Sequence, residues 1–196
     1  MQRLKRALIW LGRIRYCRGF GIQSPTDYSF VRYVINEHYP YYAFEDLNRS
    51  LNTLDAQTLR LCKLYFRLAN YCQSPLFVDV CPASTAAAVY VKAACRKTVV
   101  DVVDDPHGYV VGNTDSPILV RCNCLEENAG LMDAVMEQVA DGSLLVVEGI
   151  KKDTASKRLW CSLTEGKRVA AAYDLYDCGI IRIDKHRYTK KYIINF

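Results

Sequence analysis

Residues 75–105 read PLFVDVCPASTAAAVYVKAACRKTVVDVVDD, and this stretch decides the class of fold. It places a short apolar run at 76–80 and a β-branched run at 98–103 on either side of an alanine-rich segment at 84–94. Continuous short apolar runs are typical of buried strands, and an alanine-rich segment between them is typical of a crossover helix. The pattern therefore predicts a strand–helix–strand unit of a parallel sheet that is covered on both faces.

The same alternation continues towards the end of the chain. It predicts, in order, a strand, a helix, a strand, a helix and a closing pair of strands at 117–122, 126–140, 144–148, 154–165, 169–175 and 179–184. The sequence thus indicates an α/β fold with a mostly parallel sheet and an antiparallel closing strand.

A helical region precedes this alternation. Apolar residues at steps of three and four predict an amphipathic, basic helix over 4–18. Ser24 and Pro25 are typical of the cap and the first turn of a second helix. We therefore divide the chain into an N-terminal helical region, residues 1–73, and an α/β domain, residues 74–196.

The connection between the second helix and the α/β domain has two parts. Residues 39–42, Tyr-Pro-Tyr-Tyr, are expected to end the second helix, because proline cannot continue a helical hydrogen-bond ladder. A polar linker is predicted from there to about Leu54. Apolar residues at helical spacing then predict a third helix over 59–71.

The composition excludes several classes of protein. The chain has 196 residues, of which 51% are hydrophobic and 24% charged, so an intrinsically disordered chain is excluded. The longest apolar runs fall far below the roughly 20 residues that a membrane span needs. The N-terminus also lacks the continuous apolar core of a secretory signal. We therefore expect a cytoplasmic protein with no membrane span.

The net charge of +5 is concentrated in one segment. Residues 1–18 hold six lysines and arginines and no acid, so the rest of the chain carries a net charge of −1. Six cations could contact nucleic-acid phosphates or a membrane surface, but the apolar stripe of the segment would then need a cover of its own. Both partners are therefore disfavoured. The favoured partner is a second copy, in a homodimer formed through the basic helix 4–18 with its cations facing solvent.

The chain has nine cysteines, and their spacing does not indicate a metal site. No pair has the two-residue gap of a zinc knuckle or a thioredoxin motif. The only close pair, Cys122 and Cys124, ends a predicted strand and has no third or fourth ligand near it in the sequence. We expect reduced thiols and no bound metal.

Four motifs, spread over nearly the whole chain, resemble a bacterial group of class I S-adenosylmethionine-dependent methyltransferases. Residues 21–25, GIQSP, resemble the H-G-[IV]-H-S-P-F signature of that group, and residues 41–45, YYAFE, resemble its Y-Y-A-[FY]-E stretch. Residues 64–71, LYFRLANY, resemble the helix before its first strand, and residues 192–196, YIINF, its closing strand. The resemblance implies a Rossmann-like, methyltransferase-type fold with N-terminal helices.

The cofactor loop departs from the pattern of that family. The loop after the first strand there reads roughly [DE]-x-G-x-x-x-G-x-[ST], because the cofactor lies against bare backbone at a helix N-terminus. Asp79 keeps the acidic position and Ser84 follows, but Cys81 replaces the first glycine and Pro82 removes a backbone donor. Asp104, at the end of the second strand, stands where the family's acid would bind both ribose hydroxyls, although an acid also suits any solvated strand end. The resemblance implies these residues as cofactor-binding positions, in a loop poorly suited to S-adenosylmethionine.

The sequence is also too short between the second and fourth strands of the family's fold. A complete member needs about 40 residues there, whereas residues 105–116 leave room for one short strand at 109–111 and for no helices. One wall of the adenine pocket would then be missing. Of the acids that follow the fourth and fifth strands in metal-dependent relatives, only Glu148 remains, the sole weak catalytic candidate. One carboxylate does not make a Mg²⁺ site.

These departures favour a methyltransferase-like protein that has lost catalysis. It would bind no cofactor and would serve as a binding or scaffold protein. The alternative is an active methyltransferase with an atypical pocket, acting on a small-molecule or protein acceptor. That enzyme would use S-adenosylmethionine through Asp79, Ser84, Asp104 and Glu148.

Overall fold

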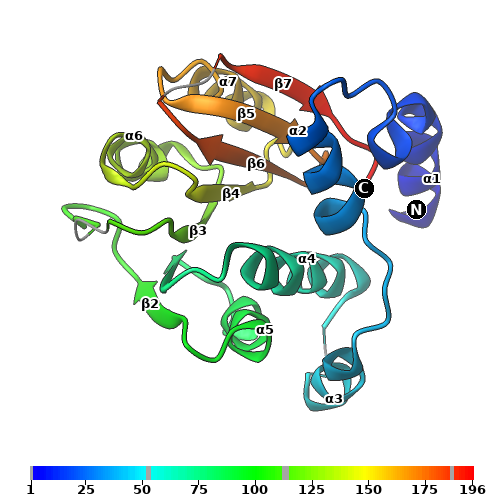
Figure 1. Cartoon of the computed structure of the whole chain (residues 1–196), viewed down its shortest axis with the longest axis horizontal. Coiled ribbons are helices and arrows are strands. Elements are labelled where there is room, and N and C mark those ends of the chain that lie inside the picture. Colours follow the sequence, from blue (N-terminus) through cyan, green and yellow to red (C-terminus); the bar gives the residue numbers. More distant parts are fainter. Residues whose placement is uncertain (1, 52–53, 112–114, 186–187) are drawn as a thin grey trace.

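A computed structural model describes residues 2–51, 54–111, 115–185 and 188–196, which form a twisted sheet flanked by helices (Figure 1). The helices are α1 (Gln2–Gly12), η1 (Ile14–Gly19), α2 (Pro25–Phe30), η2 (Val31–Ile35), α3 (Tyr42–Ser50), α4 (Ala56–Cys72), α5 (Ala86–Ala94), η3 (Glu126–Asn128), α6 (Ala129–Gln138) and α7 (Thr154–Leu163). The strands are β1 (Leu76–Val80), β2 (Val99–Val103), β3 (Leu119–Asn123), β4 (Leu144–Glu148), β5 (Val169–Asp174), β6 (Cys178–Ile183) and β7 (Lys190–Ile193).

The sheet has the predicted mostly parallel arrangement. Its seven described strands lie in the order β2-β1-β3-β4-β6-β5-β7. The strands β1 to β4 are parallel, β6 runs antiparallel between β4 and β5, and β7 is parallel to β5. The predicted α/β class with an antiparallel closing strand is therefore confirmed.

Apolar cores lie on both faces of the sheet, as the continuous apolar strands predicted. The helices α6 and α7 cover one face, where Met132 and Trp160 belong to a core with Val147. The helices α4 and α5 and the α2–η2 segment cover the other face, where Leu64 belongs to a core with Phe77 (Figure 1). The second core joins helices that precede residue 73 with strands that follow it.

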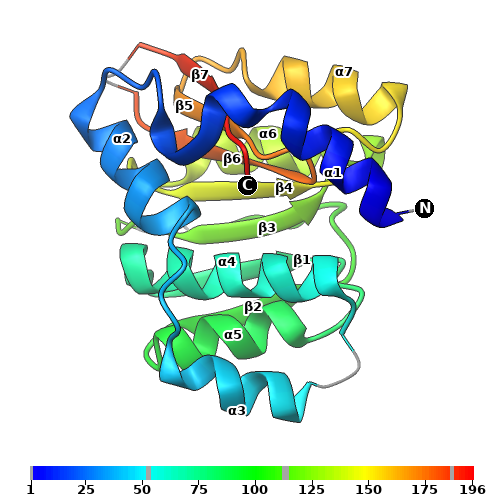
Figure 2. The ribbon, with the colours of Figure 1, turned by 90° about the vertical axis from the view of Figure 1, so that its right-hand side faces the viewer.

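The polar linker predicted up to Leu54 is wrong for most of its length. Residues Tyr42–Ser50 form α3, whose Phe44 packs against Phe66 of α4 and Tyr90 of α5. Figure 2 shows α3 as the outermost helix on this side. Its apolar residues recur every three or four positions, a period that the charged residues between them obscure.

The predicted N-terminal helix 4–18 is broken in the structure. The α-helix ends at Gly12, and η1 contains non-helical backbone angles, including a φ of +52° at Arg18. The chain then turns at Gly19 and Gly21, whose φ angles are +79° and +85°. Glycine adopts this left-handed region without a steric penalty.

The second helix begins where its sequence predicted. Ser24 caps α2 by accepting a hydrogen bond from the Asp27 backbone N–H, and Pro25 occupies the first turn. The buried Asp27 carboxylate accepts hydrogen bonds from the Tyr173 hydroxyl at 2.8 Å and from Arg182 at 2.5 Å. These contacts connect the N-terminal helices to the closing strands of the sheet.

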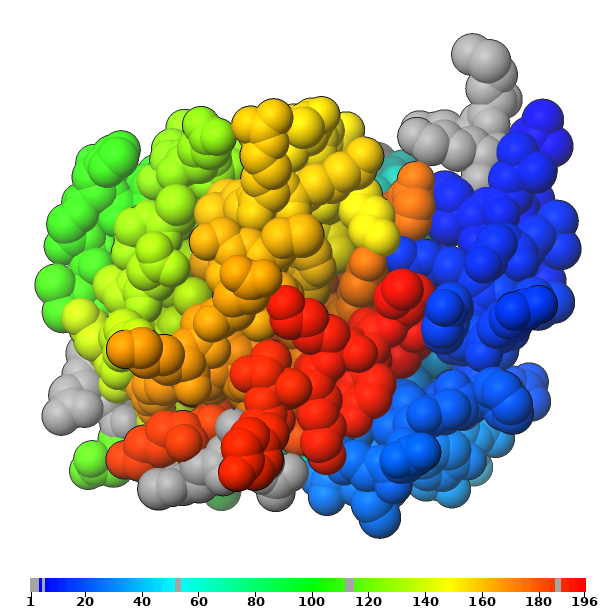
Figure 3. All heavy atoms as spheres, turned by 90° about the horizontal axis from the view of Figure 1, so that it is seen from above, coloured from blue at the N-terminus to red at the C-terminus, as the bar shows by residue number. Residues whose placement is uncertain are grey.

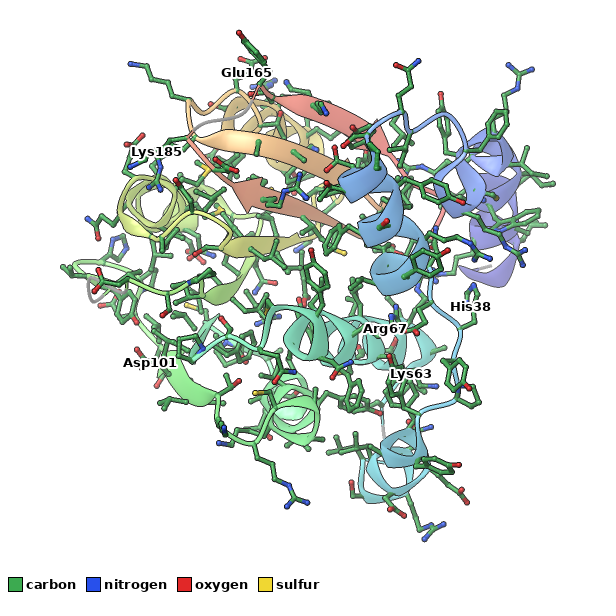
Figure 4. All side chains as sticks on the ribbon, in the orientation of Figure 1. His38, Lys63, Arg67, Asp101, Glu165 and Lys185 are labelled. Atoms are coloured by element: carbon green, nitrogen blue, oxygen red, sulfur yellow. The ribbon has the colours of Figure 1, made fainter. Side chains whose placement is uncertain are left out.

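The third predicted helix, 59–71, is confirmed as part of α4. Its Arg67, labelled in Figure 4, is buried and points at the end of η2. The guanidinium donates to the carbonyl oxygens of Val34 at 2.7 Å and Ile35 at 3.0 Å. Because those carbonyls lack helical partners at a helix end, Arg67 fixes η2 against α4.

The strand β2 forms one edge of the sheet, because residues 104–111 and 115–118 contain no strand. The short strand for which residues 109–111 left room is not formed. Tyr109 instead donates a hydrogen bond to Asp101 of β2, which Figure 4 labels at the outer edge. The described chain has no strand or helix beyond β2, in keeping with the predicted shortening.

No helix in the described ranges is long and apolar enough to cross a bilayer. All nine cysteines are unpaired thiols. Within the same ranges, no three His, Cys, Asp or Glu side chains are grouped so that they could hold a metal ion.

Candidate functional site at the carboxyl edge of the sheet

The candidate site lies where the carboxyl ends of β1, β3 and β4 meet. β1 pairs with β2 on one side and with β3 on the other. Open α/β sheets bind their ligands at the carboxyl ends of the strands where the strand order changes in this way. Asp79, Arg121 and Glu148 lie near the ends of the three strands. Strand alternation turns all three side chains to the face that α4 covers.

Arg121 bridges the two acids of this edge. Its Nη1 donates to Asp79 Oδ1 at 3.2 Å. Its Nε and Nη2 donate to the two oxygens of Glu148 at 3.0 and 3.2 Å. The contact with Glu148 uses both prongs of the guanidinium, which is the strongest arrangement for an arginine–carboxylate pair.

A tyrosine from α4 completes the network. The Tyr65 hydroxyl donates to Glu148 Oε1 at 2.5 Å, and the Tyr65 side chain is buried. Burial, together with the negative charge of Glu148, raises the pKa of Tyr65 well above its usual value. The hydroxyl therefore stays protonated and acts as a hydrogen-bond donor.

Burial also affects the pKa values of Asp79 and Arg121. It raises the pKa of Asp79, and the neighbouring Arg121 offsets only part of that effect. Burial alone would lower the pKa of Arg121, but the hydrogen bond to Glu148 and the nearby acidic groups raise it overall. The second oxygen of Asp79, Oδ2, is buried and has no hydrogen-bond partner among the described residues. A ligand cannot reach this carboxylate unless side chains move away from it.

Glu148 also borders a cleft of about 400 Å³. Asn123, its partner in the β3–β4 ladder, lines the same cleft. The remaining lining residues come from α4 and from the loops after β4 and β5: Gln57, Leu61, Gly149, Lys151, Lys152, Tyr176 and Asp177. The only strand-end carboxylate in this cleft, Glu148, already accepts three hydrogen bonds from Arg121 and Tyr65.

In the loop after β1, Cys81 forms hydrogen bonds to the end of β2 and to the residue that follows it. Cys81 has a φ of +45°, the left-handed conformation that a glycine would adopt without strain. Its N–H donates to the Val103 carbonyl at 2.7 Å, and its thiol donates to the Asp104 carbonyl at 3.3 Å. Burial and the nearby acids raise the pKa of the thiol, so it remains a donor. The methyltransferase group described above has a glycine at this position. Here the position holds a side chain that is hydrogen-bonded to the residue after β2.

The two other predicted cofactor positions lie outside the cleft beside Glu148. Ser84 is exposed, and its hydroxyl accepts a hydrogen bond from the Ala86 N–H at 3.4 Å, at the start of α5. Asp104 is exposed at the end of β2. The structure brings Asp79 and Glu148 together through Arg121, and it brings Cys81 next to the backbone of Asp104.

Sequence reasoning missed Arg121 and Tyr65 as members of the site. Arg121 stands inside an otherwise apolar strand, and an ionised side chain is rarely buried without a partner. That signal could have indicated an acid on a neighbouring strand. Tyr65 offered no comparable signal, because an aromatic residue at helical spacing is an ordinary core residue.

Comparisons with known proteins identify the fold. No family model matches the chain, and no curated protein matches it. Among solved structures, the SAH-bound methyltransferase PaMTH1 of Podospora anserina aligns with a TM-score of 0.52 and 12% identity, over 83% of this chain and 97% of that one. The SAM-bound amino pentose methyltransferase CalS10 of Micromonospora echinaspora aligns with a TM-score of 0.27 and 16% identity, over 57% and 58%.

The chain has the class I methyltransferase fold. The match to PaMTH1 supports this statement together with the strand order. At 12% identity the likeness concerns the fold alone, and a fold does not determine an activity.

Proposed function

We propose that this chain is a non-catalytic binding or scaffold protein built on a methyltransferase fold. It neither binds S-adenosylmethionine in the manner usual for that fold nor transfers a methyl group. Its resemblance to a bacterial methyltransferase group suggests a shortened, divergent member of that group. A cytoplasmic location remains the prediction made from the sequence.

The observation that carries the proposal is the position of Arg121. It lies across Asp79 and Glu148, the two carboxylates that the sequence offers at the carboxyl edge of β1 and β4. A carboxylate that acts as a base or binds a divalent cation must present free oxygen lone pairs. Here the guanidinium and the Tyr65 hydroxyl already occupy three of the roughly four lone-pair sites of Glu148.

The residues of the cofactor loop do not fit S-adenosylmethionine. The Cβ and Sγ of Cys81 occupy the place of a bare glycine, and Pro82 has no backbone N–H to donate. Asp79 is fully buried. Next to β1, β2 is the edge strand of the described sheet, so no further strand in the described residues would support an adenine ring there.

The alternative is an active methyltransferase with an atypical pocket. One observation favours it: a cleft of about 400 Å³ opens beside Glu148 at the edge where this fold binds its ligands. In that case Asp104, which is exposed at the end of β2, would be free to accept hydrogen bonds from a ribose.

Calorimetric titration with S-adenosylmethionine and S-adenosylhomocysteine separates the two functions. We expect no heat of binding up to about millimolar ligand, which corresponds to a free energy weaker than about −4 kcal/mol. PaMTH1, which is known in an SAH-bound form, is the positive control under the same conditions. A micromolar dissociation constant for this chain would refute the proposal and favour the active enzyme.

A further inference from the structure

The helix α1 packs on the protein through its charged face. Arg6 donates to Asp177 at 2.6 Å. Arg13 lies seven residues further along, directly after α1, and is buried. It donates to the Asp174 carboxylate at 2.8 Å and to the Ile194 carbonyl at 3.0 Å. The expectation that the cations of this segment face solvent is therefore wrong for these two arginines.

The apolar face of α1 points outward as a consequence. Leu4, Leu8 and Leu11 share one side of the helix, because they are four and three residues apart. They are 70%, 62% and 56% exposed. Figures 2 and 3 show α1 along the outside of the molecule at one end, away from the core helices.

The exposed apolar residues continue past the end of α1. Trp10, Ile14, Tyr16 and Phe20 are each at least 40% exposed, and Phe20 is 80% exposed. Together with Leu4, Leu8 and Leu11 they form what we call the α1 face. So many exposed large apolar side chains within one segment of 17 residues, 4–20, are unusual for a soluble monomer, and we interpret the segment as an interaction surface.

The exposed charges within residues 14–20 are positive. Arg15 and Arg18 are exposed, and neither forms an ion pair with any residue the structure describes. The first acidic residue of the sequence is Asp27, so no carboxylate lies within or next to this segment in the chain. The surface therefore combines leucines and aromatic residues with unpaired cations.

We propose that the α1 face binds the surface of an anionic lipid bilayer. Helices that lie in a membrane interface combine Leu, Trp and Phe on one side with Lys and Arg at the borders. Trp10, Phe20 and the leucines would enter the boundary between headgroups and acyl chains, while Arg15 and Arg18 would meet lipid phosphates. The inward bonds of Arg6 and Arg13 hold α1 in this orientation on the folded protein.

Charge argues against a second copy as the occupant of this face. A symmetric dimer would place the same patch of each copy against the other, and so would bring two cationic segments together. Like charges facing each other weaken association, whereas anionic lipid attracts both exposed arginines. The homodimer predicted from the sequence is thus the competing outcome of the test. The proposal does not depend on whether the chain binds S-adenosylmethionine.

Flotation with lipid vesicles tests the proposal on the full chain. We expect binding to phosphatidylcholine vesicles that contain about 30% phosphatidylglycerol, and little binding to pure phosphatidylcholine. Trp10 should report insertion by a shift of its fluorescence to shorter wavelength, which W10F should abolish. The only other tryptophan, Trp160, is a buried residue of α7 and serves as the constant background.

A pair of matched triple variants locates the contact. L4E/L8E/L11E changes exposed residues of α1 and should lower vesicle affinity by about 100-fold or more, because three buried apolar side chains are lost. Y33E/Y42E/V110E changes three residues elsewhere that are each more than 60% exposed, and it should bind as the wild type does. Thermal unfolding followed by circular dichroism verifies that both variants remain folded.

Two further measurements test the proposal: the vesicle affinity of a variant without the exposed arginines, and the particle mass of the protein in solution. R15Q/R18Q should weaken binding by roughly 30-fold, which corresponds to about 1 kcal/mol for each cation near the surface. Equal binding of the two triple variants would overturn the proposal. A particle mass by light scattering that is twice that of the chain, and that L4E/L8E/L11E halves, would also overturn it and establish the dimer.

Discussion

At the scale of single residues, Arg121 holds two carboxylates together that would otherwise repel each other. It lies opposite Asp79 in the β1–β3 ladder and reaches Glu148 at the end of β4. An ionised group in such a site is tolerated only when partners compensate for its lost hydration. The same contacts that make the site stable therefore leave neither oxygen of Glu148 without a hydrogen-bond partner.

Replacing Arg121 with methionine tests this role. R121M leaves Asp79 and Glu148 without their counterion, so we expect a loss of about 3–5 kcal/mol in the free energy of unfolding. Urea denaturation measures this loss. The loss should be smaller at about pH 4.5 than at about pH 8, because burial raises the pKa of Asp79 and a protonated Asp79 needs no counterion.

Two comparisons make the result interpretable. R49M removes an arginine whose ion pairs with Glu45 and Asp46 are exposed, and it should cost less than about 1 kcal/mol. The triple variant R121M/D79N/E148Q removes the like charges as well and should recover most of the loss. If R121M costs no more than R49M, Arg121 does not hold the acids together.

At the scale of elements, Asp27 joins α2 to the closing strands. It accepts hydrogen bonds from Tyr173 of β5, Arg182 of β6 and Tyr192 of β7. Burial by itself would raise the pKa of this carboxyl, but the hydrogen bonds from Ser24 and the two tyrosines, with the charge of Arg182, lower it overall. The family-like motif around Ser24 thus has a structural role, because it positions Asp27 over the sheet.

Acid titration of stability tests the role of Asp27. A carboxyl whose pKa is lowered on folding stabilises the protein above the pKa of the unfolded chain, about 4, and this contribution is lost as the pH falls further. D27N should lower the free energy of unfolding at neutral pH by about 3 kcal/mol, because it leaves Arg182 buried and unpaired. It should also flatten the decline of stability below about pH 4.

The control for this titration is D133N, which changes an exposed acid on α6. Its stability should follow the wild-type curve at every pH. Urea midpoints for the three proteins across the acid range provide the measurement. A decline with the same slope in D27N and wild type would contradict the role assigned to Asp27.

At the scale of the whole molecule, the N-terminal helices and the sheet share one core. Phe30 and Leu64, which precede residue 73, belong to the same buried cluster as Phe77 and Ile180. The C-terminal segment is also held by the N-terminal region, since Arg60 donates to the Phe196 carbonyl at 2.8 Å. The division at residue 73 stays a prediction from sequence pattern, and apolar residues from both sides of it belong to one buried cluster.

The fragment 74–196 should consequently fail to fold by itself. Without α2, η2 and α4 one face of its sheet would be exposed to water, and each large apolar side chain left exposed costs about 1.5–3 kcal/mol. We expect a fragment without cooperative thermal unfolding by circular dichroism and without dispersed amide signals in NMR spectra. The full chain is the control, and a cooperative transition in the fragment would show two independent domains.

Local pattern and chain length were sufficient to predict the class of fold. Strands such as 76–80 and 144–148 and the helix 59–71 follow from apolar runs and from periodicity, which depend on near neighbours in the sequence. The shortening after β2 follows from a count of residues, because twelve residues cannot form the missing elements. The replacement of the first motif glycine by Cys81 could also be recognised from the sequence, because a motif involves only neighbouring residues.

Contacts between distant segments lay beyond such reasoning. Arg121 meets Glu148 because three strands align in register, and no local period encodes that register. The helix α3 escaped prediction because its apolar stripe is defined by α4 and α5, which cover it. The orientation of α1 depends on acids more than 150 residues away, Asp174 and Asp177, whose charges draw Arg6 and Arg13 inward and leave the leucines in water. The amphipathic pattern of that helix is a property of its sequence, but which side faces the solvent depends on the partner it packs against.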